Sequence, residues 1–228
     1  PAVPPSAVPA GATPAPSNLD PGFNPEPPPA GQTQTEATAP QSARFDAGMV
    51  RIQVLLDRAH FSPGVIDGYD GGNVRKAVSA YQEANSLPVN GVAGDALLTR
   101  LEQSDASPAL VAYVLTAEDV AGPFVDVPRD LEAMSRLQRV GYEAAEEAVA
   151  EKFHMDEHLL RTLNPGADFS RAGTQIVVAN GGGELTAQVA SIEVDVAEGI
   201  VRAFDASNQL VAFYPATIGS GDAPAPLG

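Results

Sequence analysis

The sequence has 228 residues, with 13 basic and 29 acidic side chains that give a formal net charge of −16 at pH 7. This charge argues against non-specific binding to nucleic acid or anionic lipid, because both need clustered Lys and Arg. The sequence contains no cysteine, which excludes a disulfide, a thiolate metal site and a cysteine nucleophile within it. No stretch approaches the about 18–20 apolar residues of a transmembrane segment.

Residues 1–42 are rich in Pro, Ala, Ser, Thr and Gln, and 12 of the 21 prolines fall within the first 40 residues. Such a composition buries too little apolar surface to offset its ordering entropy, so we expect a disordered, extended spacer. A ligand for a proline-recognising domain is the alternative. The chain opens on Pro1 without a signal segment, which indicates a processed or trimmed protein.

Residues 46–103 carry three runs of apolar residues at the i, i+3, i+4 spacing of a buried helical face. The runs are Ile52, Leu55, Leu56 and Ala59, then Val74, Ala77, Val78 and Tyr81, then Leu97, Leu98 and Leu101. Turn-forming stretches separate the runs, and Asn73 stands where the N-cap of the second helix is expected. Three short helices predict a compact bundle with a small core.

Four motifs follow one another through this bundle. They are Ile52-Gln53, Gly64-Val65-Ile66-Asp67-Gly68, Tyr81-Gln82 and Leu87-Pro88-Val89-Asn90-Gly91. With these motifs, residues 46–103 resemble the peptidoglycan-binding domain found beside many cell-wall hydrolases and transpeptidases. The resemblance implies peptidoglycan, its glycan strands and stem peptides, as the partner.

The resemblance makes six residues the candidate peptidoglycan contacts: Asp67, Gly68, Tyr81, Gln82, Asn90 and Gly91. The same residues also have a purely structural interpretation. The glycines would supply positive φ angles, Asp67 would fix a turn, and Gln53 and Gln82 would satisfy backbone groups between helices.

Residues 104–134 are predicted to be a connector with one strand, at 110–115. Two helices are expected next: one with Glu143, Glu146 and Glu147 near its start and one capped by Asp156. A stop at Asn164-Pro165-Gly166 and a strand at 175–178 complete the pattern. Residues 135–180 therefore resemble a lysin motif, a βααβ unit. The usual Gly-Asp-Thr entry is replaced by Glu143-Ala144-Ala145, so we expect a mainly structural module.

His154 and His158 have the i, i+4 spacing of a metal-binding pair on a helix. However, the helix break expected near Asp156 would separate them, no HExxH arrangement is present, and no third ligand is evident. The sequence therefore predicts neither a metal site nor a cofactor.

After Gly181-Gly182-Gly183 the apolar period changes to two, which predicts a three-stranded antiparallel meander through residues 192–214. Residues 188–228 resemble the opening strands of the L,D-transpeptidase catalytic domain, a β-rich fold. The likeness lies in Ile192-Glu193-Val194-Asp195, Thr217-Ile218-Gly219 and Pro226-Leu227-Gly228. The fold expected for the whole chain is thus multidomain α+β.

This second resemblance implies acyl transfer. A cysteine thiolate attacks the carbonyl of the third residue of a tetrapeptide stem and releases D-alanine, and an amine of a neighbouring stem then takes the acyl group. The Ser-His-Gly-Cys signature of the family is absent, so we expect a truncated, non-catalytic front part that is inactive alone and contains no catalytic residue.

The expected location is the periplasm or cell envelope, reached through a signal peptide that this chain does not contain. Two alternatives stay open. One is a non-catalytic envelope protein that binds or anchors to peptidoglycan, and the other is an acidic envelope scaffold with protein partners.

Overall fold

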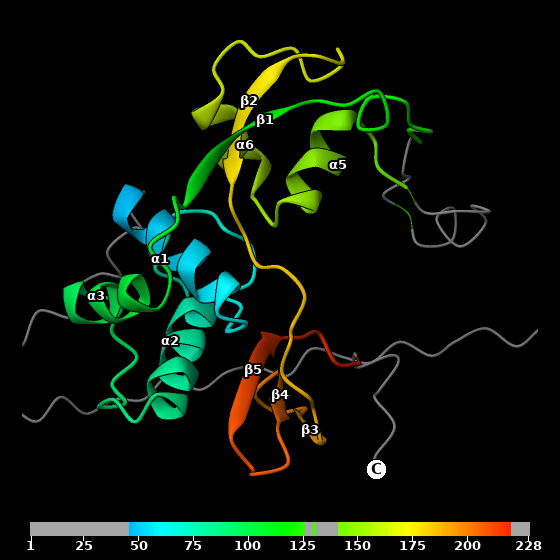
Figure 1. Cartoon of the computed structure of the whole chain (residues 1–228). Helices are drawn as coiled ribbons and strands as arrows, with labels where there is room; N and C mark the ends of the chain where they lie inside the picture. Colours follow the sequence, from blue (N-terminus) through cyan, green and yellow to red (C-terminus); the bar gives the residue numbers. More distant parts are fainter. Residues whose placement is uncertain (1–45, 126–129, 131–140, 220–228) are drawn as a thin grey trace, which may run out of the picture. The chain divides into compact units, whose positions relative to one another are not determined.

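The computed structural model describes residues 46–125, 130 and 141–219, and these residues form an α+β fold. Five helices and two small antiparallel sheets lie within them (Figure 1). The predictions for residues 1–42 and for Pro226-Leu227-Gly228 concern parts outside the described ranges. None of the helices in those ranges is long and apolar enough to cross a membrane.

The three predicted helices of the bundle are confirmed as α1 (Ala47–Arg58), α2 (Gly72–Ala84) and α3 (Asp95–Ser104). Asp46 caps α1, because its side chain accepts a hydrogen bond from the backbone N–H of Gly48 at 2.7 Å. The prediction of Asn73 as the cap of α2 is wrong. The preceding turn ends in extended backbone at Gly71, so the helix begins at Gly72 and Asn73 lies inside its first turn.

The first hydrophobic core lies between these three helices and includes the apolar residues predicted to face inward, except Ala59 and Leu98, which are only partly buried against it. Two of its members, Ile200 and Phe213, come from the meander, more than 90 residues further along the chain than α3. The core residues are Met49, Ile52, Leu55, Leu56, Phe61, Val74, Ala77, Val78, Ala80, Tyr81, Leu97, Leu101, Ile200 and Phe213. The bundle and the meander are therefore packed against each other.

The smaller of the two sheets consists of two antiparallel strands, β1 (Leu110–Val114) and β2 (Gln175–Ala179). Between them in the chain come α5 (Ala145–Lys152) and α6 (Glu157–Leu163), so the order is β1-α5-α6-β2. The strand expected in the connector is thus present and pairs with the closing strand of residues 135–180. The connector and that unit share one sheet.

A second hydrophobic core fills the space under this sheet, and α1 contributes to it as well. Val50 and Val54 of α1 and the nearby Ile66 are buried among residues of α5, α6 and β2. Main-chain bonds reinforce this contact: the N–H of Ile66 donates to the carbonyl of His154 at 2.8 Å, and the N–H of Asp156 donates to the carbonyl of Ile66 at 2.9 Å.

Asp57, on the last turn of α1, ties the chain after β2 to the bundle. Its buried carboxylate accepts a hydrogen bond from the backbone N–H of Gly182 at 2.8 Å. A Cβ atom at Gly182 would lie 2.7 Å from the carbonyl oxygen of Asp57, so only glycine fits. The glycine run predicted as a linker is therefore packed against α1 at this point.

The predicted meander is confirmed as β3 (Ser191–Asp195), β4 (Ile200–Phe204) and β5 (Leu210–Pro215), paired in that order. Residues 60–62 lie along the outer edge of β5. The N–H of Ser62 donates to the carbonyl of Phe213, and the N–H of Phe213 donates to the carbonyl of His60, both at 2.8 Å. The bundle thus extends the meander sheet by a short parallel bridge.

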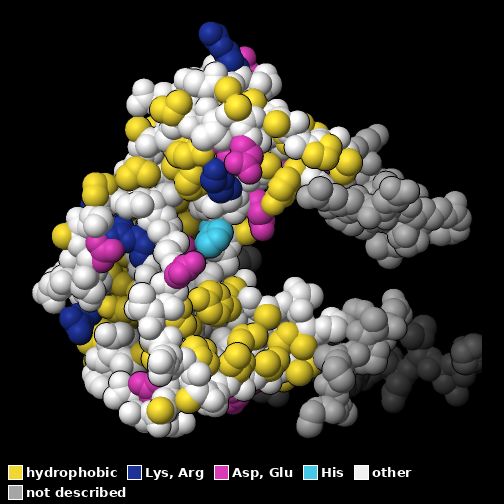
Figure 2. Space-filling model, turned by 45° about the vertical axis from the view of Figure 1, so that its right-hand side comes forward, with side chains coloured by type: hydrophobic (Ala, Val, Ile, Leu, Met, Phe, Trp, Pro, Cys, Tyr) yellow, Lys and Arg dark blue, Asp and Glu magenta, His cyan; other side chains and the backbone are white. Residues whose placement is uncertain are grey.

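The two faces of the meander differ in what covers them. Phe213 is 1% exposed against the bundle core, whereas Ile192 is 66% exposed and Val194 is 51% exposed. Tyr214, which points to the same side as Val194 according to the strand register, is also exposed. The space-filling view shows hydrophobic side chains gathered on the surface over these strands (Figure 2).

The shared core predicts unequal costs for two neighbouring aromatic residues. Phe213→Ala should destabilise the chain by about 3–5 kcal/mol, because it leaves a cavity between β5 and the bundle. Tyr214→Ala on the open face is the matched control and should cost less than about 1 kcal/mol. Urea unfolding of both variants measures the difference. Equal losses would contradict docking of the meander on the bundle.

Candidate functional site

Gln53 holds the first of two similar turns in the bundle. Its side chain is completely buried, and its Oε1 accepts hydrogen bonds from the backbone N–H groups of Asp67 at 3.2 Å and Gly68 at 2.8 Å. Its Nε2 donates to Oδ1 of Asp67 at 2.8 Å. All strong hydrogen-bonding groups of this amide are used inside the protein, which fixes the turn after α1.

Gln82 holds the second turn in the same way. Its Oε1 accepts from the N–H groups of Asn90 at 2.9 Å and Gly91 at 3.0 Å, and its Nε2 donates to Oδ1 of Asn90 at 2.8 Å. In both turns the glycine has a positive φ angle, 79° at Gly68 and 66° at Gly91. A second glycine then leads into a helix in each case, α2 or α3.

The two turns therefore form an internal repeat that the sequence analysis did not use. The pattern is Asp67-Gly68-x-x-Gly71 in the first copy and Asn90-Gly91-x-x-Gly94 in the second, each held by a glutamine that follows a core residue. A comparison of the sequence with itself over these segments would have found it.

The six candidate contact residues separate into three groups. Asp67 and Gly68 form one turn and Gln82, Asn90 and Gly91 form the other. Tyr81 lies in the core, 3% exposed, with its ring packed edge-on against Phe61 at a centroid distance of 5.4 Å. Five of the six thus shape two turns, and only their outer surfaces can meet a ligand. Contact of these residues with peptidoglycan stays a prediction.

A pocket lies beside each turn. Asp67 and Tyr69 line one of about 350 Å³ at the start of α2. Asn90 and Gly91 line one of about 340 Å³ between α2 and the β3–β4 turn. Both pockets are open to solvent. Each lies against one of the two turns whose backbone N–H groups are hydrogen-bonded to a buried glutamine.

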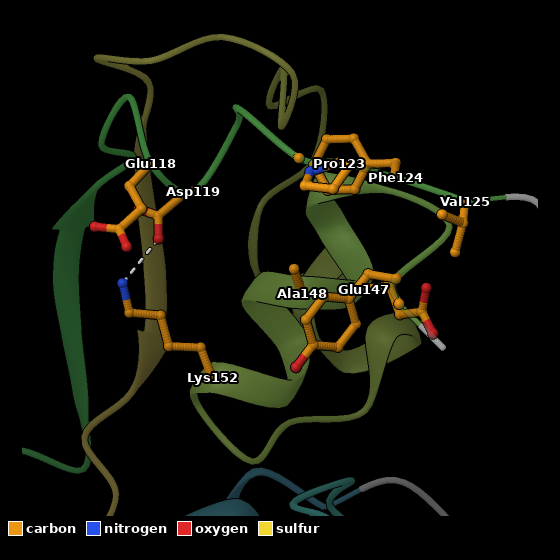
Figure 3. A pocket seen from close by; sticks show the side chains of 11 residues that line it. Glu118, Asp119, Pro123, Phe124, Val125, Glu147, Ala148 and Lys152 are labelled. Atoms are coloured by element: carbon orange, nitrogen blue, oxygen red, sulfur yellow. Dashed lines mark hydrogen bonds and ion pairs between the residues drawn. The ribbon is translucent and has the colours of Figure 1, made fainter. Parts of the chain in front are cut away.

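A larger pocket, of about 760 Å³, lies between the segment after β1 and helix α5, and the sequence analysis did not indicate it. Figure 3 shows Phe124 over Pro123 at one side and Lys152 with Asp119 at the other. Phe124 and Tyr142 are 38% and 41% exposed, and Glu147 also lines the pocket. Exposed aromatic rings can stack on a flat apolar face of a ligand, and neighbouring carboxylates can accept hydrogen bonds from the hydroxyl groups of that ligand.

Asp119, at the edge of this pocket, belongs to a network with Tyr113 and Lys152. Lys152 donates to Asp119 and to the Tyr113 hydroxyl, both at 2.8 Å, and Tyr113 donates to Asp119 at 2.7 Å. Burial raises the pKa of Asp119, but the Lys152 ammonium, the Thr116 N–H and the Tyr113 hydroxyl outweigh it and hold that pKa far below its usual range. The network is internally satisfied and serves to anchor α5 to β1.

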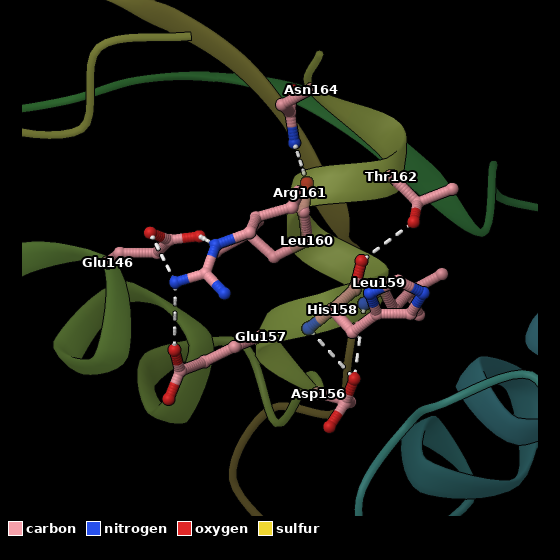
Figure 4. A network of polar contacts seen from close by, with 9 residues as sticks. All are labelled: Glu146, Asp156, Glu157, His158, Leu159, Leu160, Arg161, Thr162 and Asn164. Atoms are coloured by element: carbon pink, nitrogen blue, oxygen red, sulfur yellow. Dashed lines mark hydrogen bonds and ion pairs between the residues drawn. The ribbon is translucent and has the colours of Figure 1, made fainter. Parts of the chain in front are cut away.

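The two histidines do not share a helix. Helix α5 ends at Lys152 and α6 starts at Glu157, with Asp156 capping α6 through the N–H of His158 at 2.9 Å, as shown in Figure 4. The predicted break at Asp156 is thus confirmed. Nδ1 of His154 instead lies 3.2 Å from the Asp57 carboxylate. Within the described ranges, no group of three or more His, Cys, Asp or Glu side chains could hold a metal ion.

The comparison with protein families gives a match, and it lies in the bundle. Residues 46–101 match the family model of a peptidoglycan binding domain. The match spans α1 and α2, most of α3, and both glutamine-held turns. No curated protein matches the chain. Residues 46–101 are thus similar to a peptidoglycan-binding domain, which supports peptidoglycan as a partner and an association with the cell wall or envelope.

The second turn should depend on Gln82. Gln82→Leu keeps the side-chain size but leaves the partly buried N–H groups of Asn90 and Gly91 without their acceptor, so we expect a loss of about 1–3 kcal/mol in unfolding free energy. Gln209→Leu, at an exposed position, is the control and should change stability little. Thermal and urea unfolding measure both. A Gln82→Leu variant as stable as the control would show that the clamp is unimportant.

Proposed function

We propose that this chain binds peptidoglycan through residues 46–101 and is the front part of an L,D-transpeptidase of the cell envelope. The match of residues 46–101 to a peptidoglycan-binding family carries the first part of the proposal. Two rigid turns, each bordered by an open pocket, supply a suitable surface for a polymer ligand. Such rigidity favours binding because little order has to be created when the polymer arrives.

The meander supports the transpeptidase part. The motif Ile192-Glu193-Val194-Asp195 lies entirely in β3, and Thr217-Ile218-Gly219 follows β5. The exposed apolar face with Ile192, Val194 and Tyr214 also favours a larger β-rich domain, because folded domains normally cover a sheet face of this composition. The resemblance of residues 188–228 to the start of the catalytic domain rests on these features.

In this proposal, residues 1–228 deliver the substrate and do not perform the bond-breaking step. The reaction needs a thiolate that forms a thioester with the stem peptide, and the chain contains no cysteine. Binding of the wall by the bundle raises the local concentration of stem peptides near any catalytic group connected to the meander.

The β1-α5-α6-β2 unit is, in this proposal, a lysin-motif-like module with a structural role. The order of its elements supports this assignment. Asn164 fixes its fold, because the side chain donates to the Val177 carbonyl at 2.7 Å and accepts from the Val177 N–H. We propose the limits 46–103, 104–134, 135–180 and 188–228, with β1 of the connector 104–134 supplying the strand that pairs with β2 of the module.

The location that fits this function is the periplasm or another compartment of the cell envelope, with export through a signal peptide. The alternative function, a wall-binding or anchoring protein without catalysis, is favoured by a specific observation: the family match covers residues 46–101 and does not extend to the meander.

Wall binding can be tested by sedimentation of the full chain with purified sacculi. We expect the chain to pellet with sacculi at low and moderate salt and to stay in the supernatant with cellulose, a polymer without stem peptides. Recovery in the supernatant in both cases would refute the proposed function.

The transpeptidase assignment predicts two results. Purified residues 1–228 should release no D-alanine from a tetrapeptide-stem muropeptide, because no thiolate is available. Cells that lack the gene should make fewer cross-links through the third stem residue, measured by chromatography of digested walls. D-alanine release by the pure chain would refute the cysteine mechanism, and an unchanged cross-link pattern would favour the anchoring alternative.

A further inference from the structure

The pocket of about 340 Å³ beside the second turn has walls from two parts of the fold. Arg75, Lys76 and Ser79 of α2 and Gly91 of the turn form one side, and Glu198 and Arg202 of the meander form the other. Because the meander is docked on the bundle through Phe213 and Ile200, this pocket exists only when both parts are folded together.

The pocket gathers positive charge in a strongly acidic chain. Three of the 13 basic residues of the whole sequence line it. Two of them have internal partners: Arg75 lies 3.2 Å from Asp70, and Lys76 lies 3.3 Å from Glu198. Arg202 differs from both, because this half-buried residue makes no ion pair or hydrogen bond with any residue that the structure describes.

Arg202 lies on the face of the sheet that is directed toward the bundle. Its register partners are Glu193 on β3 and Phe213 on β5, and Phe213 is buried in the bundle core. Five N–H donors in a planar fork are therefore held at the pocket wall without an acceptor from the described part of the chain. A planar guanidinium can bind a carboxylate through two parallel hydrogen bonds, so Arg202 is suited to anchor an incoming carboxylate.

The walls around Arg202 are firmly held. Lys76 Nζ donates to the backbone carbonyl of Glu198 at 2.6 Å, which fixes the β3–β4 turn to α2. On the opposite side, a Cβ atom at Gly91 would lie 3.0 Å from Oγ of Ser79, so the second turn is pressed against the same helix. The pocket is thus formed before any ligand binds, which lowers the entropy cost of binding.

We propose that this pocket binds a carboxylate of a peptidoglycan stem peptide, with Arg202 as the anchoring residue. The inference rests on the proposed wall binding and specifies its ligand group. Stem peptides are the part of the polymer that carries free carboxylates and an amine, whereas N-acetylated sugars are uncharged. Glu83, an exposed residue on the rim, provides a negative charge for the amine.

The test uses the full chain and a soluble disaccharide with a tetrapeptide stem as the probe, measured by calorimetry. The chain should bind this muropeptide in a salt-sensitive manner and should bind an uncharged N-acetylglucosamine tetramer much more weakly. Arg202→Gln should weaken muropeptide binding by about tenfold, the value of one charged hydrogen-bonded pair.

Two further variants make the test specific. Arg171→Gln removes an arginine that is exposed elsewhere on the chain and should leave affinity within about twofold. Arg202→Lys keeps the charge but loses the planar fork, so it should recover part of the affinity, and it carries the test if Arg202→Gln does not fold. Circular dichroism of each variant checks the fold.

The outcomes separate this inference from the proposed function. If the chain pellets with sacculi but Arg202→Gln binds the muropeptide as well as the wild type, the pocket assignment is wrong and wall binding stands. The same conclusion follows if inorganic phosphate competes as strongly as the muropeptide, since that identifies a general anion site. If the wild-type chain does not pellet with sacculi, both proposals fail.

Discussion

Helix α1 is the element on which the rest of the described structure depends, because it is buried on two sides. Ile52 and Leu56 lie in the core of the bundle, whereas Val50 and Val54 lie in the core beneath β1 and β2. A helix in a small isolated bundle would leave one of these sides in water. Here the side with Val50 and Val54 is covered by the β1-α5-α6-β2 unit. Because burial of these apolar side chains is favourable, the three-helix bundle and that unit stabilise each other.

The local structure was largely predictable because its causes are local. Apolar spacing located all five described helices and the strands, and the cap at Asp156 was read from one residue type in front of an apolar run. The N-cap of α2 was misplaced by two residues, since the extended backbone at Gly71 is set by the turn and not by the side chain of Asn73. The residue at which a helix begins therefore depends on the backbone conformation of the preceding turn.

The candidate pockets could not be predicted in the same way, because they depend on contacts between distant segments. Arg202 becomes a wall of the second-turn pocket only when Phe213 enters the bundle core, and nothing within the meander sequence specifies that partner. Gln53 and Gln82 were recognised as residues of interest, but their role as matched clamps is evident only from the seven hydrogen bonds that their side chains make.

The short bridge between residues 60–62 and β5 has a mechanical consequence. If the bundle binds the wall as proposed, a tensile force on it reaches the meander through the main-chain bonds of Phe213 with Ser62 and His60 and through the shared hydrophobic core. A stretched wall would therefore pull on β5 at once, and the strand would transmit the tension of the polymer to whatever the sheet supports.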